Sequence, residues 1–157
     1  MFITLINYFF YNCTNLNTVS FPSTISAIDA NAFRNTGVTD ISFPEGLLTI
    51  ERHSFRDCTS LITFYIPSTV IYIGTYVLNG CTSLASLTSD LATPLTISSN
   101  TFTGIPFESA ILYVPEGKTS IYTSTSVWNS FTTINEPTVL GAASNTKKNA
   151  VKIVVNK

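Results

Sequence analysis

The sequence predicts a β-rich solenoid that is right-handed and parallel-stranded, with about five coils, one continuous inner sheet and a C-terminal cap. Three observations support this fold class. Residues 13–36, 37–57 and 58–80 align almost without gaps at a period of 22–23 residues, and a fourth copy opens at Cys81. Four columns of equivalent residues keep register through the copies. The composition, 45% hydrophobic and 11% charged, supplies a core and excludes intrinsic disorder.

Each column has one role within a coil. Apolar residues alternate inward along a short strand, and a proline ends the strand because its ring has no N–H for a ladder. A leucine-initiated repeat of about 20–29 residues is typical of a leucine-rich-repeat horseshoe, in which neighbouring coils cover each other's apolar faces. The columns are Leu16, Val38, Leu61 and Leu84; Pro22, Pro44 and Pro67; Ile28, Ile50 and Ile73; and Phe33, Phe55 and Leu78.

Between the inward residues, one position in each strand faces outward. Because equivalent strands lie side by side, these positions form a ladder on one face of the sheet. The ladder is predicted as the ligand-binding surface and consists of Ser20, Ser42, Tyr65, Thr88 and Tyr113. Tyr65 and Tyr113 are its best single contact candidates, because a large amphipathic ring at an outward position has no packing role.

The repeat also resembles a known family. Its pattern is L-x-x-[VIF]-x-[FI]-P-x-x-[VIL]-x-x-I-x-x-x-x-F-x-x-C, with the phrases FPST, IPST, CTNL and CTSL. It is similar to the BspA-like leucine-rich repeat over about residues 2–135. Thr36-Gly37, Asp29, Glu51 and Leu78 depart from the family pattern at single positions. The resemblance implies a module of bacterial or protist surface proteins that serves adhesion.

Three segments follow from the repeat and its ends. Residues 1–109 hold the repeats, with a truncated first coil in which Phe2, Leu5, Phe10 and Cys13 occupy repeat columns. We expect further repeats and a secretion signal before it, unless a partner covers this end. Residues 110–137 hold the last strand and a capping segment, which resembles the family's closing helix that bears Tyr and Trp. There Ile121, Tyr122, Trp128 and Phe131 would cover the last coil. Residues 138–157 form a linker or tail, or the start of another domain.

Charge and motif content argue against several function classes. Before residue 138 there are four positive and nine negative residues, so neither nucleic acid nor an anionic membrane is an expected partner. No apolar run suits membrane insertion. His53, the only histidine, shares a variable column with Asn31 and Tyr76 and is expected to be a spacer. No nucleophile motif or paired carboxylates occur, so the chain is not predicted to be an enzyme and needs no cofactor.

The cysteines indicate neither a metal site nor a redox motif. Cys13, Cys58 and Cys81 are spaced by 45 and 23 residues, without CxxC or a paired histidine. Cys58 and Cys81 fall on successive coils, at a separation that a disulfide could span. Buried free thiols facing main-chain carbonyls are favoured over a bridge, because parallel side chains on successive coils seldom have disulfide geometry.

The predicted function is a non-enzymatic adhesion-type module of a cell-surface or secreted protein that binds a protein or glycan. The alternative is a passive spacer or stalk that presents another domain, which the featureless positions Ser20, Ser42 and Thr88 would suit. The chain is expected to be a monomer or part of a longer repeat array. Binding is expected to depend weakly on salt, because Asp40 is the only charge recognised on the ladder strands.

Overall fold

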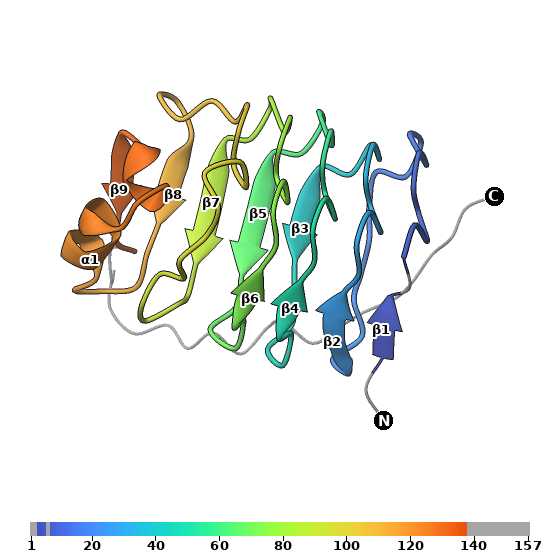
Figure 1. Cartoon of the computed structure of the whole chain (residues 1–157), viewed down its shortest axis with the longest axis horizontal. Helices are drawn as coiled ribbons and strands as arrows, with labels where there is room; N and C mark the ends of the chain where they lie inside the picture. The colour runs from blue at the N-terminus through green and yellow to red at the C-terminus, as the bar shows by residue number, and fades with distance from the viewer. Residues whose placement is uncertain (1–2, 6, 138–157) are drawn as a thin grey trace.

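The computed structural model describes residues 3–5 and 7–137, and the tail at 138–157 lies outside the described residues. The elements in chain order are β1 (Ile3–Leu5), β2 (Ile25–Ile28), β3 (Asp40–Ser42), β4 (Thr49–Ile50), β5 (Thr63–Ile66), β6 (Tyr72–Ile73), β7 (Ser86–Ser89), β8 (Ile111–Tyr113), α1 (Thr119–Ser124), the 3₁₀ turn η1 (Trp128–Ser130) and β9 (Thr133–Asn135). Successive coils stack along one axis, with α1 at the C-terminal end (Figure 1).

The coils form a β-solenoid of about five turns, as predicted. The strands make two parallel sheets, one in the order β3-β5-β7-β8-β9 and the other β1-β2-β4-β6. The prediction of a single inner sheet is therefore incomplete, because the return side of each coil is also paired. Ile25 and Ile28 are buried on this second side, where β-branched side chains fit a pleated, half-buried surface.

The predicted columns stack along the solenoid. Val38, Leu61 and Leu84 are buried, and Ile50 pairs in register with Ile73. Tight turns follow β2, β4 and β6, where Asn31, His53 and Tyr76 have φ between 58° and 59°. Left-handed backbone at equivalent residues shows that each coil repeats the same turn. His53 is half-buried within this stack, in agreement with the expected half-exposed position.

Both core cysteines are free and buried, which confirms the preference for thiols over a bridge. The Sγ of Cys58 donates to the Phe33 carbonyl at 3.0 Å, and the Sγ of Cys81 donates to the Phe55 carbonyl at 3.2 Å. Burial raises the pKa of both thiols. Cys13 is exposed on the first coil. The thiols therefore act as small core residues that also satisfy main-chain acceptors.

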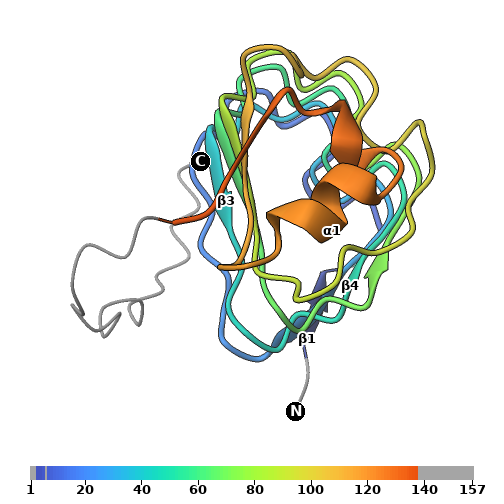
Figure 2. The same cartoon turned by 90° about the vertical axis from the view of Figure 1, so that its left-hand side faces the viewer.

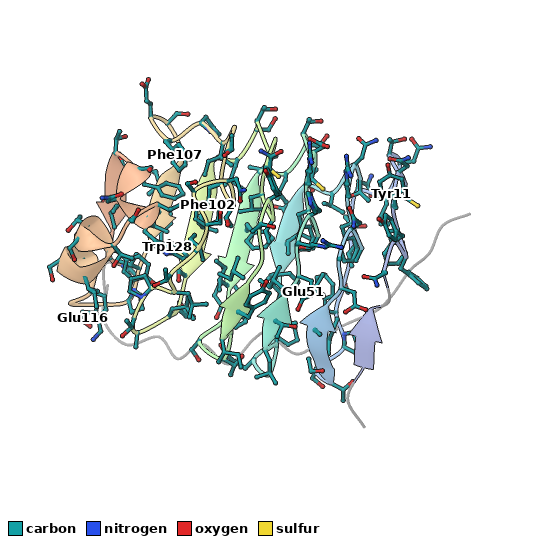
Figure 3. The ribbon with its side chains drawn as sticks, viewed as in Figure 1. Tyr11, Glu51, Phe102, Phe107, Glu116 and Trp128 are labelled. Carbon is teal, nitrogen blue, oxygen red and sulfur yellow. The ribbon has the colours of Figure 1, made fainter. Side chains whose placement is uncertain are left out.

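The C-terminal elements lie across the end of the last coil (Figure 2). Trp128 is fully buried, as expected, and its Nε1 donates to the Leu95 carbonyl at 2.8 Å. Its ring meets that of Phe102 edge to face at a centroid distance of 5.3 Å (Figure 3). α1 carries Tyr122, whereas Trp128 begins η1, so a single closing helix bearing both residues is not formed. The boundaries at residues 109 and 137 stay predictions.

One strand was not recognised in the sequence. β9 follows η1 and pairs in parallel with β8, so the five-stranded sheet continues beyond the last repeat. Its sequence, TIN, is only three residues long. Pro137 keeps the place of the strand-ending proline, but Glu136 replaces the apolar residue before it, so the repeat pattern marks this strand poorly.

Candidate functional site

The outward face of the five-stranded sheet carries the predicted ladder. Ser42 pairs with Tyr65, Tyr65 with Thr88, and Thr88 with Tyr113, each one coil apart. The structure thus brings four of the five predicted residues into one row. Ser20 is half-buried in an irregular segment before β2 and belongs to neither sheet. Asn135 on β9 takes the next place after Tyr113 and extends the row at the opposite end.

A second outward row runs beside this ladder. It consists of Asp40, Thr63, Ser86, Ile111 and Thr133. The Asp40 carboxylate accepts hydrogen bonds from the hydroxyl of Thr63 at 2.7 Å and from that of Thr39 at 2.8 Å. These bonds tie two coils together and fix the carboxylate at the edge of the sheet. The face therefore presents hydroxyl groups with one held acidic group among them.

The side chain of Tyr65 is held between two carboxylates. Its hydroxyl lies 2.5 Å from Oδ2 of Asp90, to which it donates, and 3.2 Å from Oε1 of Glu45. Ser68 donates to the other oxygen of Glu45 at 3.0 Å. Burial, followed by the effect of Asp90 and Glu45, raises the pKa of Tyr65 far above its usual range. Tyr65 is therefore held in place on the interior strand β5, contrary to the expectation of a ring without a packing role.

The charge predicted for this face was wrong. Glu45 and Asp90 come from the coils on either side of Tyr65, so the ladder carries two acidic residues in addition to Asp40. Their separations from Tyr65 in sequence, 20 and 25 residues, are close to one repeat period. That spacing was the signal available in the sequence. Glu45 and Asp90 follow the strands, however, so the columns of strand residues do not contain them.

The remaining ladder residues are available for contact. Within the described part of the chain, the hydroxyl groups of Ser42, Thr88 and Tyr113 have no hydrogen-bond partner. Ser42 is exposed, whereas Thr88 and Tyr113 are half-buried. A half-buried tyrosine has a fixed ring and an unpaired hydroxyl, a combination common among contact residues. Tyr113 and Thr88, which are directly paired, thus form the most favourable contact point of the ladder.

The described residues form neither a metal-binding cluster nor a nucleophile-base pair at His53. Over residues 7–137, no group of three His, Cys, Asp or Glu side chains is placed to hold a metal ion. His53 Nδ1 and Ser54 Oγ are both buried without a hydrogen-bond partner, so these neighbours do not form a nucleophile-base pair. None of the described helices is long and apolar enough to cross a membrane.

Comparison with known families agrees with the repeat geometry. A family model described as a BspA type leucine rich repeat region, in six copies, matches residues 3–125. The chain belongs to the BspA-type leucine-rich repeat family. Members of this family are typically adhesion-type repeat modules at surfaces, and leucine-rich repeats generally bind proteins and are generally non-enzymatic. No curated protein and no solved structure matches the chain.

Proposed function

We propose that this BspA-type chain is an adhesion module, at a cell surface or secreted, that binds an extracellular protein or glycan through the ladder face. The observation that carries the proposal is the row of Ser42, Tyr65, Thr88 and Tyr113, held in register across four strands. A rigid row of hydroxyl and aromatic groups can bind without an ordering cost in the protein. Tyr113 and Thr88 serve as the central contact.

The acidic groups indicate the chemistry of the partner. Asp40, Glu45 and Asp90 border the ladder, each held by hydroxyl donors from neighbouring residues. A partner that offers Lys or Arg side chains, or sugar hydroxyl groups, would complement such a surface. We therefore expect binding to a basic protein to weaken with added salt, which replaces the weak salt dependence inferred from the strand residues alone.

The test uses a matched pair of tyrosine variants. The full chain is labelled and screened against a glycan array and a panel of purified extracellular-matrix proteins, and Kd is measured for each hit. Tyr113→Ser should weaken binding at least about tenfold, as truncation of an aromatic contact does. Tyr72→Ser removes a tyrosine that is 47% exposed on the other sheet and should leave Kd unchanged. Equal loss in both variants would move the contact surface away from the ladder.

The passive spacer remains the second candidate. The short polar side chains of the ladder, Ser42 and Thr88, would suit a stalk, because they offer little contact area. Absence of any ligand across both screens, with the chain shown to be folded by its melting transition, would favour the spacer. A hit that tolerates Tyr113→Ser and Tyr65→Phe together would contradict the proposed surface but not the adhesion role.

A further inference from the structure

A cluster of arginines lies away from the ladder. Of the four positive residues before residue 138, three lie on the turns that follow β2 and β4. They are Arg34, Arg52 and Arg56, and the fourth, Lys118, precedes α1. The Arg34 carbonyl accepts a hydrogen bond from the N–H of Asn12, and the Arg56 carbonyl accepts one from the N–H of Asn35. The same bond to the preceding coil shows that Arg34 and Arg56 are equivalent residues, one coil apart. That separation is about 4.8 Å.

Two of the guanidinium groups are held in place. The guanidinium of Arg34 lies 5.7 Å from the ring centroid of Tyr11, and that of Arg56 lies 5.6 Å from the ring centroid of Tyr76. The Nε atoms of Arg34 and Arg56 lie 3.6 and 3.3 Å from the same Oδ2 of Asp57. Cation–π contact and a shared carboxylate restrain both long side chains, so less entropy is lost when a ligand binds.

The outer donors of these groups have no acceptor among the described residues. Each guanidinium has five N–H donors, and within residues 7–137 only Asp57 pairs with any of them. Arg52 is exposed and takes part in no ion pair or hydrogen bond of its side chain with the described residues. One carboxylate, that of Asp57, pairs with two of the three guanidinium groups, so positive charge is in excess among these paired groups. The part of the chain before residue 138 has four positive and nine negative residues, so this charge is opposite in sign to its surroundings.

His53 lies among the three arginines. Burial, and then Arg56, Arg34 and Arg52 in decreasing order, lower its pKa, while Asp57 alone opposes them. The imidazole ring stacks on Tyr76 with 4.9 Å between centroids and 4° between planes. The imidazole thus reports a positive local potential beside an aromatic surface.

The dimensions of the cluster limit its ligand. A nucleic acid carries a phosphate charge every ~1.7 Å of duplex and needs a long basic stripe, whereas this cluster spans adjacent coils only. Forked guanidinium donors bind a single carboxylate or sulfate well, because their geometry matches two oxygens of one anion. Tyr11, which is 39% exposed, adds a flat ring beside Arg34, and such a ring suits the C–H face of a sugar.

We propose that Arg34, Arg52 and Arg56 form a binding site for a sugar that bears a carboxylate or sulfate group, with Tyr11 against the sugar ring. The site is separate from the ladder face and does not depend on the function proposed for that face. The anion is held by the outer N–H donors, while Asp57 keeps the two inner Nε atoms in position. An acidic peptide is the competing ligand that the experiment must distinguish.

The experiment uses the two single aromatic reporters of the chain. His53 is the only histidine and Trp128 the only tryptophan, so NMR of the full chain gives one resonance in the cluster and one at the opposite end. The probes are tetragalacturonate for a carboxylate, a heparin tetrasaccharide for a sulfate, chitotetraose as the uncharged sugar and tetraglutamate as the acidic peptide. We expect an acidic sugar to shift the His53 signal saturably, leave Trp128 unmoved and raise the pKa of His53, because the bound anion stabilises the imidazolium.

Substitutions of positively charged residues test whether the anion binds at the three arginines. Arg34→Gln with Arg56→Gln should weaken binding at least about tenfold, since charge-assisted hydrogen bonds are lost. Arg52→Gln changes an exposed residue without side-chain partners, so it tests the site even where the double variant fails to fold. It should weaken binding several-fold. Lys118→Gln removes the fourth cation and should have no effect, and Tyr113→Ser on the ladder should have none either.

Several results would overturn the proposal. These are an unmoved His53 signal with both acidic sugars, an equal response to chitotetraose, tighter binding of tetraglutamate than of either sugar, or an unchanged Kd in Arg52→Gln. Loss of binding in Lys118→Gln would assign the anion to another surface. Loss of ladder binding with this response intact would count against the proposed function alone.

Discussion

The rings of Phe33 and Phe55 are stacked with 5.1 Å between centroids and 4° between planes, one coil apart. Phe10 continues the stack on one side, at 5.1 Å from Phe33. Equivalent residues therefore meet face to face along the solenoid axis, and each ring is covered by the coils before and after it. This contact makes each coil depend on its neighbours, as expected for a repeat whose units cannot bury their apolar faces alone.

The first prediction concerns this stack. Phe55 is fully buried, so Phe55→Ala should lower the free energy of unfolding by about 3–5 kcal/mol through lost burial and a cavity. Urea unfolding followed by circular dichroism measures the change. Ile62→Ala is the control, because Ile62 is 43% exposed and its truncation should cost less than about 0.5 kcal/mol. Similar values for the two variants would contradict the stacked core.

The second prediction concerns the hydroxyl of Tyr122. It donates to the Leu91 carbonyl at 2.9 Å and lies 2.7 Å from the Ser89 hydroxyl, both in the last coil. Tyr122→Phe keeps the ring but leaves these two buried groups without their partner, which should cost about 1–3 kcal/mol. Thermal unfolding monitored by Trp128 fluorescence measures the loss. Tyr72→Phe, on an exposed ring, should not change the melting temperature, and an unchanged Tyr122→Phe would show that water replaces the bonds.

The third prediction concerns thiol reactivity. Cys13 is exposed, whereas Cys58 and Cys81 are buried and have raised pKa values. The thiolate is the reactive form, so the folded protein should show one fast thiol with Ellman's reagent and two slow ones. All three should react after addition of guanidinium chloride. Cys13→Ser should remove the fast phase, and a fast phase that persists would mean that a core thiol is accessible.

The fourth prediction concerns acid stability. The N–H of Gly117, and then the N–H and hydroxyl of Thr119, stabilise the charged form of Glu136 and lower its pKa to about 2. The two bonds from Thr119 measure 3.0 and 2.7 Å. Because the folded pKa lies below the unfolded value, the stabilisation is complete above about pH 4.5 and is lost as the pH falls toward 2.

Denaturant unfolding at a series of pH values between 6 and 2 tests this. Glu136→Gln should be less stable than the parent at pH 6, and the two should converge as the pH falls toward 2. Glu116→Gln is the control, because Glu116 is exposed and takes part in no hydrogen bond or ion pair with the described residues. A parent and Glu136→Gln that keep a constant difference across this range would show that Glu136 does not titrate with folding.

Much of the candidate site was accessible from the sequence because the repeat fixes which residues are equivalent. Once Ser42, Tyr65 and Thr88 occupy one column, parallel pairing must place them in a row. Ser20 shares that column but lies outside the sheet, since β3 is the first strand of the ladder sheet in chain order. Column membership thus predicts which residues are neighbours, but it does not predict where a sheet begins.

The sequence by itself determined the repeat, its inward columns, the buried cysteines and the burial of Trp128, because each follows from a period and from the apolar or polar character of single residues. Only the tertiary structure decided that Glu45 and Asp90 meet Tyr65, that β9 extends the sheet, and that Arg34 and Arg56 share Asp57. The contacts of Tyr65 join residues 20 and 25 positions apart, whereas the Arg34–Asp57 pair and the pairing of β9 with β8 fall close to one period. All these contacts depend on side-chain direction and turn geometry, which a list of equivalent positions does not contain.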